Sequence, residues 1–285
     1  MLRMIRAFKL IEVGPRDGLQ AFKHKIISPQ VKANYINKLI DSGIKNIEVG
    51  SFVSDKIIQM KNTPEVIPLI NRKSDTNLIT LVGNLKYAQE AIKYNINEFA
   101  VFTTISETFC QKNNGCSIDT NLKKIYEVVK FAHENNIRVR GYISCVFGCP
   151  FEGYDESYIR KTKSIVKDLL GMGCYEVSIA DTIGMANPQM IITTLKPLYD
   201  YRDHLAIHLH DPIGKAKYNL VTAICFGINN IDCATGGIGG CPAAKDPGSN
   251  IDTETVIKLL NEFNYYHNID LVKIQAASKY IRDEL

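Results

Sequence analysis

The chain has 285 residues, of which 45% are hydrophobic and 22% are charged, and its formal net charge is +4. This composition is ordinary for a globular protein, and the length is sufficient to bury a sizeable core. The sequence contains no basic run and no apolar run of membrane-spanning length, so we expect neither nucleic acid nor a membrane as a partner. The stretch Met1–Arg6 is too short for a signal or transit peptide, which predicts a cytoplasmic location.

Short β-branched or apolar runs alternate with longer helical patterns along the chain. Strands are predicted at Lys9–Val13, Asn46–Val49, Asn77–Val82, Glu98–Thr103, Arg138–Cys145, Glu176–Ala180, Leu205–His210 and Asn230–Cys233. Helices are predicted at Pro29–Ser42, Pro64–Arg72, Leu85–Tyr94, Ile118–Asn135, Glu156–Met172, Pro188–Tyr201, Lys215–Gly227 and Thr253–Phe263. Capping residues before proline, at Ser28-Pro29 and Asn187-Pro188, agree with two of the helix starts.

Eight strand–helix units in this length favour an α/β fold with a single (β/α)8 TIM barrel over residues 1–285. Leu271–Arg282 is predicted to be an extra C-terminal helix. The alternative is a doubly wound sheet, although its strand count would be high.

Polar residues gather at the ends of several predicted strands. They are Arg16, Asp17 and Gln20 after the first strand, Glu48 in the second, Asp181 after the sixth, and His208 and His210 in the seventh. The carboxyl ends of barrel strands form one mouth, where the active sites of this fold lie. A single acid at a strand end is often a helix cap, but four such ends together favour a shared site.

The most informative of these strands carries the sequence His208-Leu209-His210. Alternating side chains on a strand share a face, so the two imidazoles are expected about 7 Å apart along the strand. One cation can bind both at that spacing. The alternative is a pair of buried core histidines with no ligand.

A glycine-rich segment, residues 236–250, follows the eighth strand. Four glycines precede Cys241 and Pro242 follows it, which predicts a flexible or tightly turning loop. The segment lacks the Gly-Lys-Ser/Thr ending of a phosphate-binding P-loop. A thiol on such a loop can act as a proton donor once substrate is bound, and the alternative is a structural cysteine in a turn.

With these motifs in place, the chain resembles the 3-hydroxy-3-methylglutaryl-CoA lyases, which are metal-dependent lyase and aldolase-like barrels. The matching motifs extend over nearly the whole chain: Glu12–Gln20, Ser51–Ser54, Val139–Tyr142, Gly148–Pro150, Asp181–Gly184, His208–Asp211 and Gly239–Pro242. The resemblance implies a homodimer that acts on a small acyl-CoA substrate in leucine catabolism.

The resemblance also implies a role for individual residues. Asp17, His208, His210 and Asn250 match the metal ligands of the family, and their oxygen and imidazole donors suit Mg²⁺ or Mn²⁺. Arg16, Glu48, Asp181, His208 and Cys241 match catalytic residues, and Arg16, Gln20 and Asn84 are expected to bind substrate.

The implied reaction cleaves 3-hydroxy-3-methylglutaryl-CoA to acetyl-CoA and acetoacetate. Asp181 or His208 would remove the hydroxyl proton, Arg16 would stabilise the enolate, and Cys241 would protonate it. Two alternatives have different chemistry: an aldolase or condensing enzyme of the same superfamily, and a non-catalytic metal-binding barrel. Cys241 disfavours the first because condensation does not need it, and the retention of both Arg16 and Cys241, which no metal ligand set needs, disfavours the second.

Overall fold

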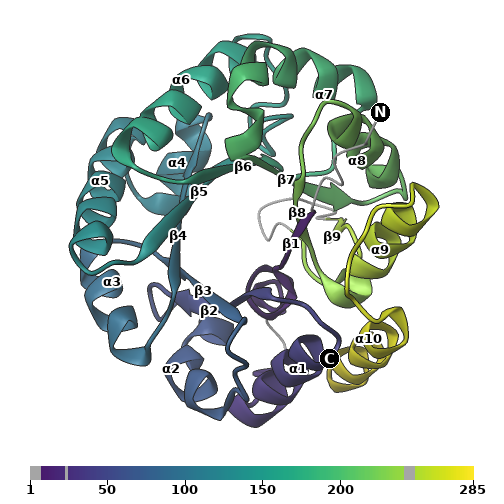
Figure 1. Cartoon of the computed structure of the whole chain (residues 1–285). Coiled ribbons are helices and arrows are strands. Elements are labelled where there is room, and N and C mark those ends of the chain that lie inside the picture. The colour runs from purple at the N-terminus through teal and green to yellow at the C-terminus, as the bar shows by residue number, and fades with distance from the viewer. Residues whose placement is uncertain (1–7, 23–24, 241–247) are drawn as a thin grey trace.

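The computed structural model describes residues 8–22, 25–240 and 248–285, and it contains a closed ring of parallel strands surrounded by helices (Figure 1). Neighbours in the ring follow the order of the chain from β1 to β8, and β1 also pairs with β8. An open doubly wound sheet would leave its first and last strands unpaired. The predicted (β/α)8 barrel with a C-terminal helix is therefore confirmed.

The strands and helices have the following bounds. The barrel strands are β1 (Lys9–Glu12), β2 (Asn46–Phe52), β3 (Asn77–Val82), β4 (Glu98–Thr104), β5 (Arg138–Ser144), β6 (Glu176–Asp181), β7 (Leu205–Asp211) and β8 (Asn230–Cys233). The helices are α1 (Pro29–Asp41), α2 (Thr63–Val66), α3 (Leu85–Ala91), α4 (Glu107–Asn114), α5 (Ile118–Glu134), α6 (Ser157–Met172), α7 (Pro188–Leu195), α8 (Ala216–Cys225), α9 (Thr253–Glu262) and α10 (Leu271–Glu284). None of the helices in the described part of the chain is both long and apolar enough to cross a membrane.

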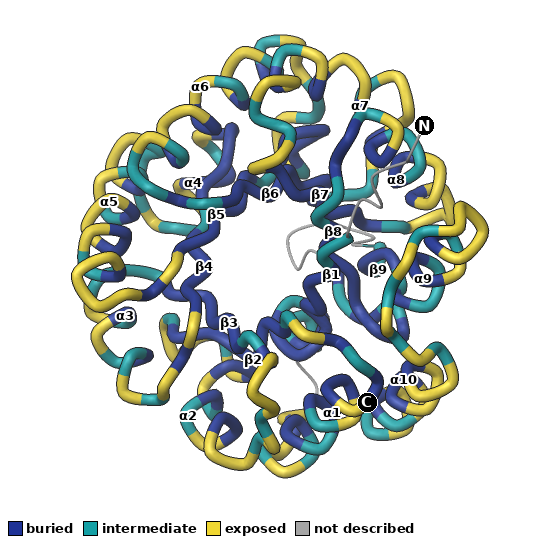
Figure 2. Tube along the Cα trace, in the orientation of Figure 1, coloured by how far each residue is buried: buried dark blue, intermediate teal, exposed yellow. Residues whose placement is uncertain are grey.

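Burial follows the two-layer design of the barrel. The strands form a buried ring, and the exposed residues lie mainly on the outward side of the helices (Figure 2). Apolar strand residues such as Ile11, Ile79 and Val177 are fully buried. The barrel interior also holds charged groups: Arg140 on β5 contacts Asp232 on β8, two strands that are not neighbours, so this ion pair crosses the interior.

Some observed elements differ from the predicted ones for local reasons. Helix α7 ends at Leu195 and continues as a 3₁₀ helix over Lys196–His204, because Pro197 cannot donate an α-helical hydrogen bond. Helix α4 was not predicted: it has eight residues and buries only two of them, so its sequence carries little periodicity. A two-residue strand, β9 (Ser249–Asn250), was also not predicted, and it pairs with the end of β7.

Glu12 at the end of β1 connects the first barrel loop to both stems of the glycine-rich segment. Its Oε1 accepts hydrogen bonds from the Gly14 N–H (3.0 Å) and the Thr235 N–H (2.9 Å). Its Oε2 accepts from the hydroxyls of Thr235 (2.6 Å) and Thr253 (2.8 Å). A Cβ at position 14 would lie 2.6 Å from Glu12 Oε1, so this close approach requires glycine. The loops that carry the predicted site are thus fixed to one buried carboxyl group.

Candidate active site

A cavity of about 690 Å³ opens at the carboxyl ends of the barrel strands. Six of the residues predicted for the site line it: Arg16, Asp17, Gln20, Asn84, His208 and His210. Glu48 and Asn250 lie behind this wall and contact residues in it. Cys241 lies outside the described residues, but Gly240, the residue before it, lines the cavity.

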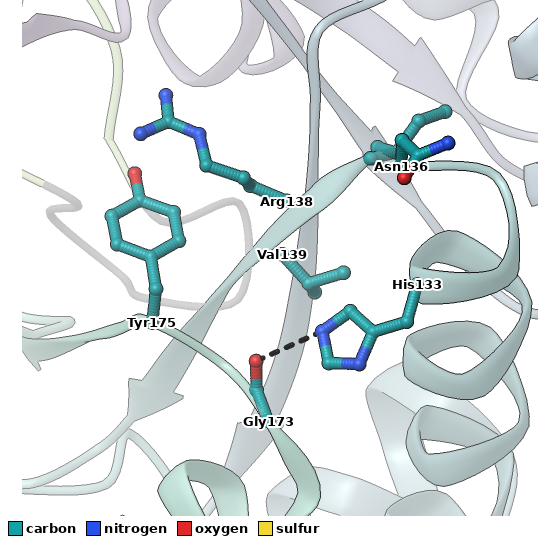
Figure 3. A pocket seen from close by; sticks show the side chains of 7 residues that line it. His133, Asn136, Arg138, Val139, Gly173 and Tyr175 are labelled. Atoms are coloured by element: carbon teal, nitrogen blue, oxygen red, sulfur yellow. Dashed lines mark hydrogen bonds between the residues drawn. The ribbon is translucent and has the colours of Figure 1, made fainter.

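A smaller hollow of about 290 Å³ lies at the opposite end of the barrel, near the first residues of β5 and β6 (Figure 3). Its histidine, His133, faces the Gly173 carbonyl oxygen at 3.2 Å. No cluster of possible metal ligands was found there among the described residues. The larger cavity is therefore the candidate active site.

Three side chains converge in the larger cavity as a possible metal site: Asp17, His208 and His210. The Nε2 atoms of His208 and His210 lie 3.2 Å apart. The Oδ2 atom of Asp17 lies 3.8 Å and 3.7 Å from these two nitrogens. Both histidines are at the end of β7, and Asp17 belongs to a π-helical turn (Gly14–Gly18) that follows β1.

The hydrogen-bonding state of the histidines fits a cation at this point. His210 Nδ1 lies 2.8 Å from the Thr182 carbonyl oxygen, which can only accept, so Nδ1 carries the proton and Nε2 of the neutral ring presents a lone pair. That lone pair faces His208 Nε2 and the Asp17 carboxylate. A divalent cation would bind these donors together, and one carboxylate with two imidazoles is a suitable donor set.

Asp17 is ionised at neutral pH. Burial by itself would raise the pKa of Asp17, but the adjacent Arg16 guanidinium and the His210 and His208 imidazoles hold it well below its ordinary value. The carboxylate therefore contributes a full negative charge to the candidate metal site.

The fourth predicted ligand reaches this site through β9. Asn250 pairs directly with His210 in the antiparallel β7–β9 contact. Its amide Nδ2 donates to Asp17 Oδ2 (3.0 Å) and to the Ile238 carbonyl oxygen (3.1 Å). The two ends of an amide are nearly indistinguishable by shape, so a rotation of this group would present its oxygen to a cation.

Arg16 lies next to the candidate metal site and is held by two carboxylates. Its Nε and one terminal nitrogen each lie 2.7 Å from Glu48 Oε2, and its other terminal nitrogen lies 2.5 Å from Asp17 Oδ1. Burial opposes its charge, but the carboxylates of Glu48 and Asp17 raise the pKa of Arg16 further. The result is a permanent cation in the cavity wall, held by contacts to two carboxylates.

Asp181 is placed differently from the other predicted residues. Its carboxylate oxygens accept hydrogen bonds from the backbone N–H groups of Met185 and Ala186, both at 3.0 Å. Burial raises the pKa of Asp181 to about 6, although these N–H groups act in the opposite direction. The cavity is lined by its neighbours Ala180 and Thr182 instead. Asp181 therefore holds the turn that presents the Thr182 carbonyl to His210.

Several residues of the site could not be assigned from the sequence. The outer wall of the cavity contains polar and cationic side chains, namely Lys56, Asn113, Asn114, Asn121 and Lys124. Most are on surface loops and helices, where lysine and asparagine are too common to signal a site. Tyr142 and Asp232 had a weak signal, because each lies in a strand whose polar residues occupy alternate positions and so share one face.

Known proteins of one family are similar to this chain over nearly its whole length. The chain matches the family model described as HMGL-like over residues 7–281. It is 40% identical over 277 residues to "3-hydroxy-3-methylglutaryl-CoA lyase, cytoplasmic" of Rattus norvegicus, covering 96% of this chain and 80% of that protein. It is 38% identical over 276 residues to "Hydroxymethylglutaryl-CoA lyase, mitochondrial" of Bos taurus, covering 96% and 84%.

One solved structure with a similar fold contains coenzyme A. An HMG-CoA lyase from Acinetobacter baumannii in complex with coenzyme A and 3-methylmalate superposes with a TM-score of 0.93 at 31% identity. The match covers 100% of this chain and 93% of that one.

Proposed function

The chain belongs to the HMGL-like family, and we propose that it is a lyase that cleaves 3-hydroxy-3-methylglutaryl-CoA to acetyl-CoA and acetoacetate. One observation carries the proposal: the permanent cation Arg16 lies beside a converging carboxylate and two imidazoles in a single cavity. This pairing suits a reaction that removes a proton from an alcohol and then collects negative charge on a thioester oxygen.

We propose that Asp17, His208, His210 and Asn250 hold one divalent cation, either Mg²⁺ or Mn²⁺. Oxygen and imidazole donors that leave room for further ligands suit Mg²⁺ or Mn²⁺. A structural zinc would instead prefer a closed cage of four ligands. When bound, the cation would polarise the substrate's hydroxyl group and so make its proton easier to remove. The geometry that supports this assignment is the 3.2 Å approach of two imidazole nitrogens beside an ionised carboxylate.

The proposed role of Arg16 is to stabilise the enolate. Cleavage of the carbon–carbon bond leaves electrons that delocalise onto the thioester oxygen, and a fixed cation stabilises this charge without reorganising. Glu48 supports the proposal as a positioning residue, because its Oε2 accepts from two nitrogens of Arg16. Cys241 would then protonate the enolate carbon to give acetyl-CoA.

Of the two candidate bases, we propose His208. It lines the cavity, whereas both oxygens of Asp181 are occupied by backbone N–H groups. This role would require His208 Nε2 to be free of the cation, in which case Asp17, His210 and Asn250 would hold it. Asp181 would act indirectly, through the turn that positions His210.

The outer wall of the cavity supports the acyl-CoA part of the proposal. Lys56 and Lys124 line it and carry positive charge, which suits the phosphates of coenzyme A. Gln20 and Asn84 are proposed to bind the substrate as well. The side chain of Asn84 also accepts a hydrogen bond from Tyr87 N–H (3.2 Å), so it caps helix α3 and its orientation is fixed.

A direct assay tests the proposed function. Purified protein with Mg²⁺ or Mn²⁺ and 3-hydroxy-3-methylglutaryl-CoA should yield equal amounts of acetyl-CoA and acetoacetate. Other 3-hydroxyacyl-CoAs and free hydroxy or oxo acids serve as competing substrates. Turnover of a free acid, with the CoA thioester left intact, would instead support an aldolase of the same superfamily.

Substitution of Arg16 by lysine should separate its role from that of the metal. Arg16→Lys keeps one positive charge but loses the planar fork that meets two carboxylates, so kcat should fall by roughly 10²-fold. The Kd for Mn²⁺, measured by titration, should stay within about threefold, because lysine keeps a positive charge near Asp17. If kcat per bound metal is unchanged while metal affinity falls, Arg16 acts as a support for Asp17 and not on the enolate.

We also propose a single catalytic domain over residues 1–285, which assembles as a homodimer and acts in leucine catabolism. The predicted cytoplasmic location is part of this proposal, and relatives are named both cytoplasmic and mitochondrial. The expected lack of nucleic-acid and membrane partners stays a prediction. Size measurement in solution and localisation of a tagged chain test these points.

A further inference from the structure

Arg140 is the centre of a buried polar network that lies beneath the cavity. Its side chain is fully buried inside the barrel on β5. Each of its three nitrogens donates to a different partner: Nε to Glu176 Oε1 (3.0 Å), one terminal nitrogen to the Tyr142 hydroxyl (2.6 Å), and the other to Asp232 Oδ1 (2.8 Å). Two of these partners lead to the active site and the third leads away from it.

The first connection runs through Asp232 to a predicted metal ligand. While Asp232 Oδ1 accepts from Arg140, Oδ2 accepts from the Ser178 hydroxyl (2.6 Å) and lies 3.5 Å from His208 Nδ1. Among the described residues, the buried His208 Nδ1 atom makes no hydrogen bond at this separation. A carboxylate facing Nδ1 favours the ring state in which Nδ1 carries the proton and Nε2 is free to bind a cation.

The second connection runs through Tyr142 to the cationic residue of the cavity. The Tyr142 hydroxyl accepts from Arg140 and donates to Glu48 Oε2 (3.3 Å), the oxygen that also accepts from Arg16. Both guanidinium groups lie near the ring of Tyr142: their carbon atoms are 4.7 Å (Arg140) and 5.4 Å (Arg16) from its centroid. A shift of Tyr142 would therefore move Glu48 and Arg16 with it.

The third partner anchors Arg140 from the far end of the barrel. Glu176 accepts from Arg140 through Oε1 and from Lys9 Nζ through Oε2 (3.1 Å). Lys9 also contacts the Tyr175 hydroxyl (2.6 Å), which lies at the amino-terminal end of the strands close to Arg138 (Figure 3). The position of Arg140 is thus fixed by groups that have no contact with the cavity.

We propose that Arg140 is a positioning residue that sets two parts of the active site at once: the His208 imidazole through Asp232, and the Glu48–Arg16 pair through Tyr142. Only arginine can do this, because its rigid fork donates in three directions in one plane, whereas a lysine ammonium has a single nitrogen. The Arg16 part of this inference rests on the proposed function, and the His208 part does not.

The metal side is tested without any substrate. Asp232→Asn keeps the size of the side chain but removes the charge facing His208, so the Kd for Mn²⁺ should rise by roughly 10- to 100-fold. Tyr142→Phe keeps both the Asp232 carboxylate and the ring that packs edge-on against His208, with centroids 6.0 Å apart, so its Kd should stay within about threefold. Electron paramagnetic resonance of free Mn²⁺ gives both values, and circular dichroism verifies that each variant is folded.

The Arg16 side is tested by kcat at saturating metal. Tyr142→Phe should lower kcat by roughly tenfold, because Glu48 loses a hydrogen bond, while Arg140 keeps its bonds to Asp232 and Glu176 and so still supports the His208 side. Arg140→Lys should show both defects in one protein. The matched control is Arg138→Lys, on the same face of the same strand, whose side chain pairs with Glu98 instead. It should leave both values within about twofold.

A folded Arg140→Lys protein with normal Mn²⁺ affinity and normal kcat overturns the inference, as does an Asp232→Asn protein with unchanged Mn²⁺ affinity. If Arg140→Lys does not fold, the separate effects of Asp232→Asn and Tyr142→Phe still decide. If the wild-type protein fails to cleave 3-hydroxy-3-methylglutaryl-CoA, the proposed function is wrong, and the Mn²⁺ titrations still judge the connection to His208.

Discussion

Removal of divalent cations is expected to abolish cleavage, and Mg²⁺ or Mn²⁺ should restore it. Without a cation, the Nε2 atoms of His208 and His210 face each other at 3.2 Å beside an ionised Asp17, and nothing polarises the substrate's hydroxyl group. The loss should reach roughly 10³-fold or more, which corresponds to the several kcal/mol that a bound cation contributes to such a transition state. Activity assays after dialysis against a chelator, with metal added back, measure this effect.

A substitution at His210 should locate the cation. His210→Ala removes a ligand itself, so the Mn²⁺ Kd should rise by more than the roughly 10- to 100-fold expected for an outer partner of a ligand. The free energy of unfolding of the metal-free protein should change by only about 1–3 kcal/mol, since one buried hydrogen bond to Thr182 is lost.

His204→Ala is the matched control for that substitution. His204 lies just before β7, at the opposite end of the same strand, and its Nδ1 contacts only a backbone carbonyl among the interactions of the described residues. This variant should bind Mn²⁺ as the wild type does. Full turnover in the presence of chelator, or equal metal affinity in both variants, would remove the metal assignment.

The fold and the meeting of the main polar residues could be predicted from the sequence because both follow from short-range patterns. Strand and helix periodicities repeat eight times, and the closure of parallel strands brings their carboxyl ends to one mouth. A correctly predicted barrel therefore brings together the strand-end residues Arg16, Asp17, His208 and His210. Their roles stay predictions, since position alone does not prove chemistry.

Side-chain direction at a strand end is much harder to predict. Asp181 and His208 both lie at the end of a strand, but Asp181 turns to the backbone of its own loop and His208 turns to the cavity. Whether a strand-end acid finds nearby N–H groups depends on the conformation of the following turn. In this chain that turn includes Gly184 at a positive φ of 67°, which the sequence suggests only weakly.

Long-range partners are the other feature that sequence patterns do not encode. Asn250 reaches the site because two residues pair with the end of β7, and no periodicity is visible in so short a strand. Asp232 is recognisable only as an acid next to apolar residues in a four-residue strand. Its contact with Arg140, 92 positions earlier in the chain, depends on how the barrel interior is filled. Such pairings form only in the folded barrel, so no local pattern in the sequence predicts them.

Substitution of Cys241 should cause the second large loss of activity. Cys241 follows Gly240 directly in the chain, and Gly240 lines the cavity that contains Arg16 and His208. Without a thiol the enolate has no proton donor, so Cys241→Ala should lower kcat by roughly 10²- to 10⁴-fold, the range of general acid catalysis. Cys241→Ser should be nearly as poor, because a hydroxyl is a much weaker acid than a thiol.

Two further measurements make this prediction specific to the lyase. The Mn²⁺ Kd of Cys241→Ala should stay within about threefold of the wild-type value, since the four proposed ligands are unchanged. An alkylating reagent should inactivate the wild type, and acyl-CoA substrate should slow that loss. Cys225→Ala is the control, because Cys225 is an exposed thiol at the end of α8, and its removal should leave both activity and inactivation as they were. Near wild-type cleavage by metal-loaded Cys241→Ala would make the cysteine incidental and would require another group to protonate the enolate.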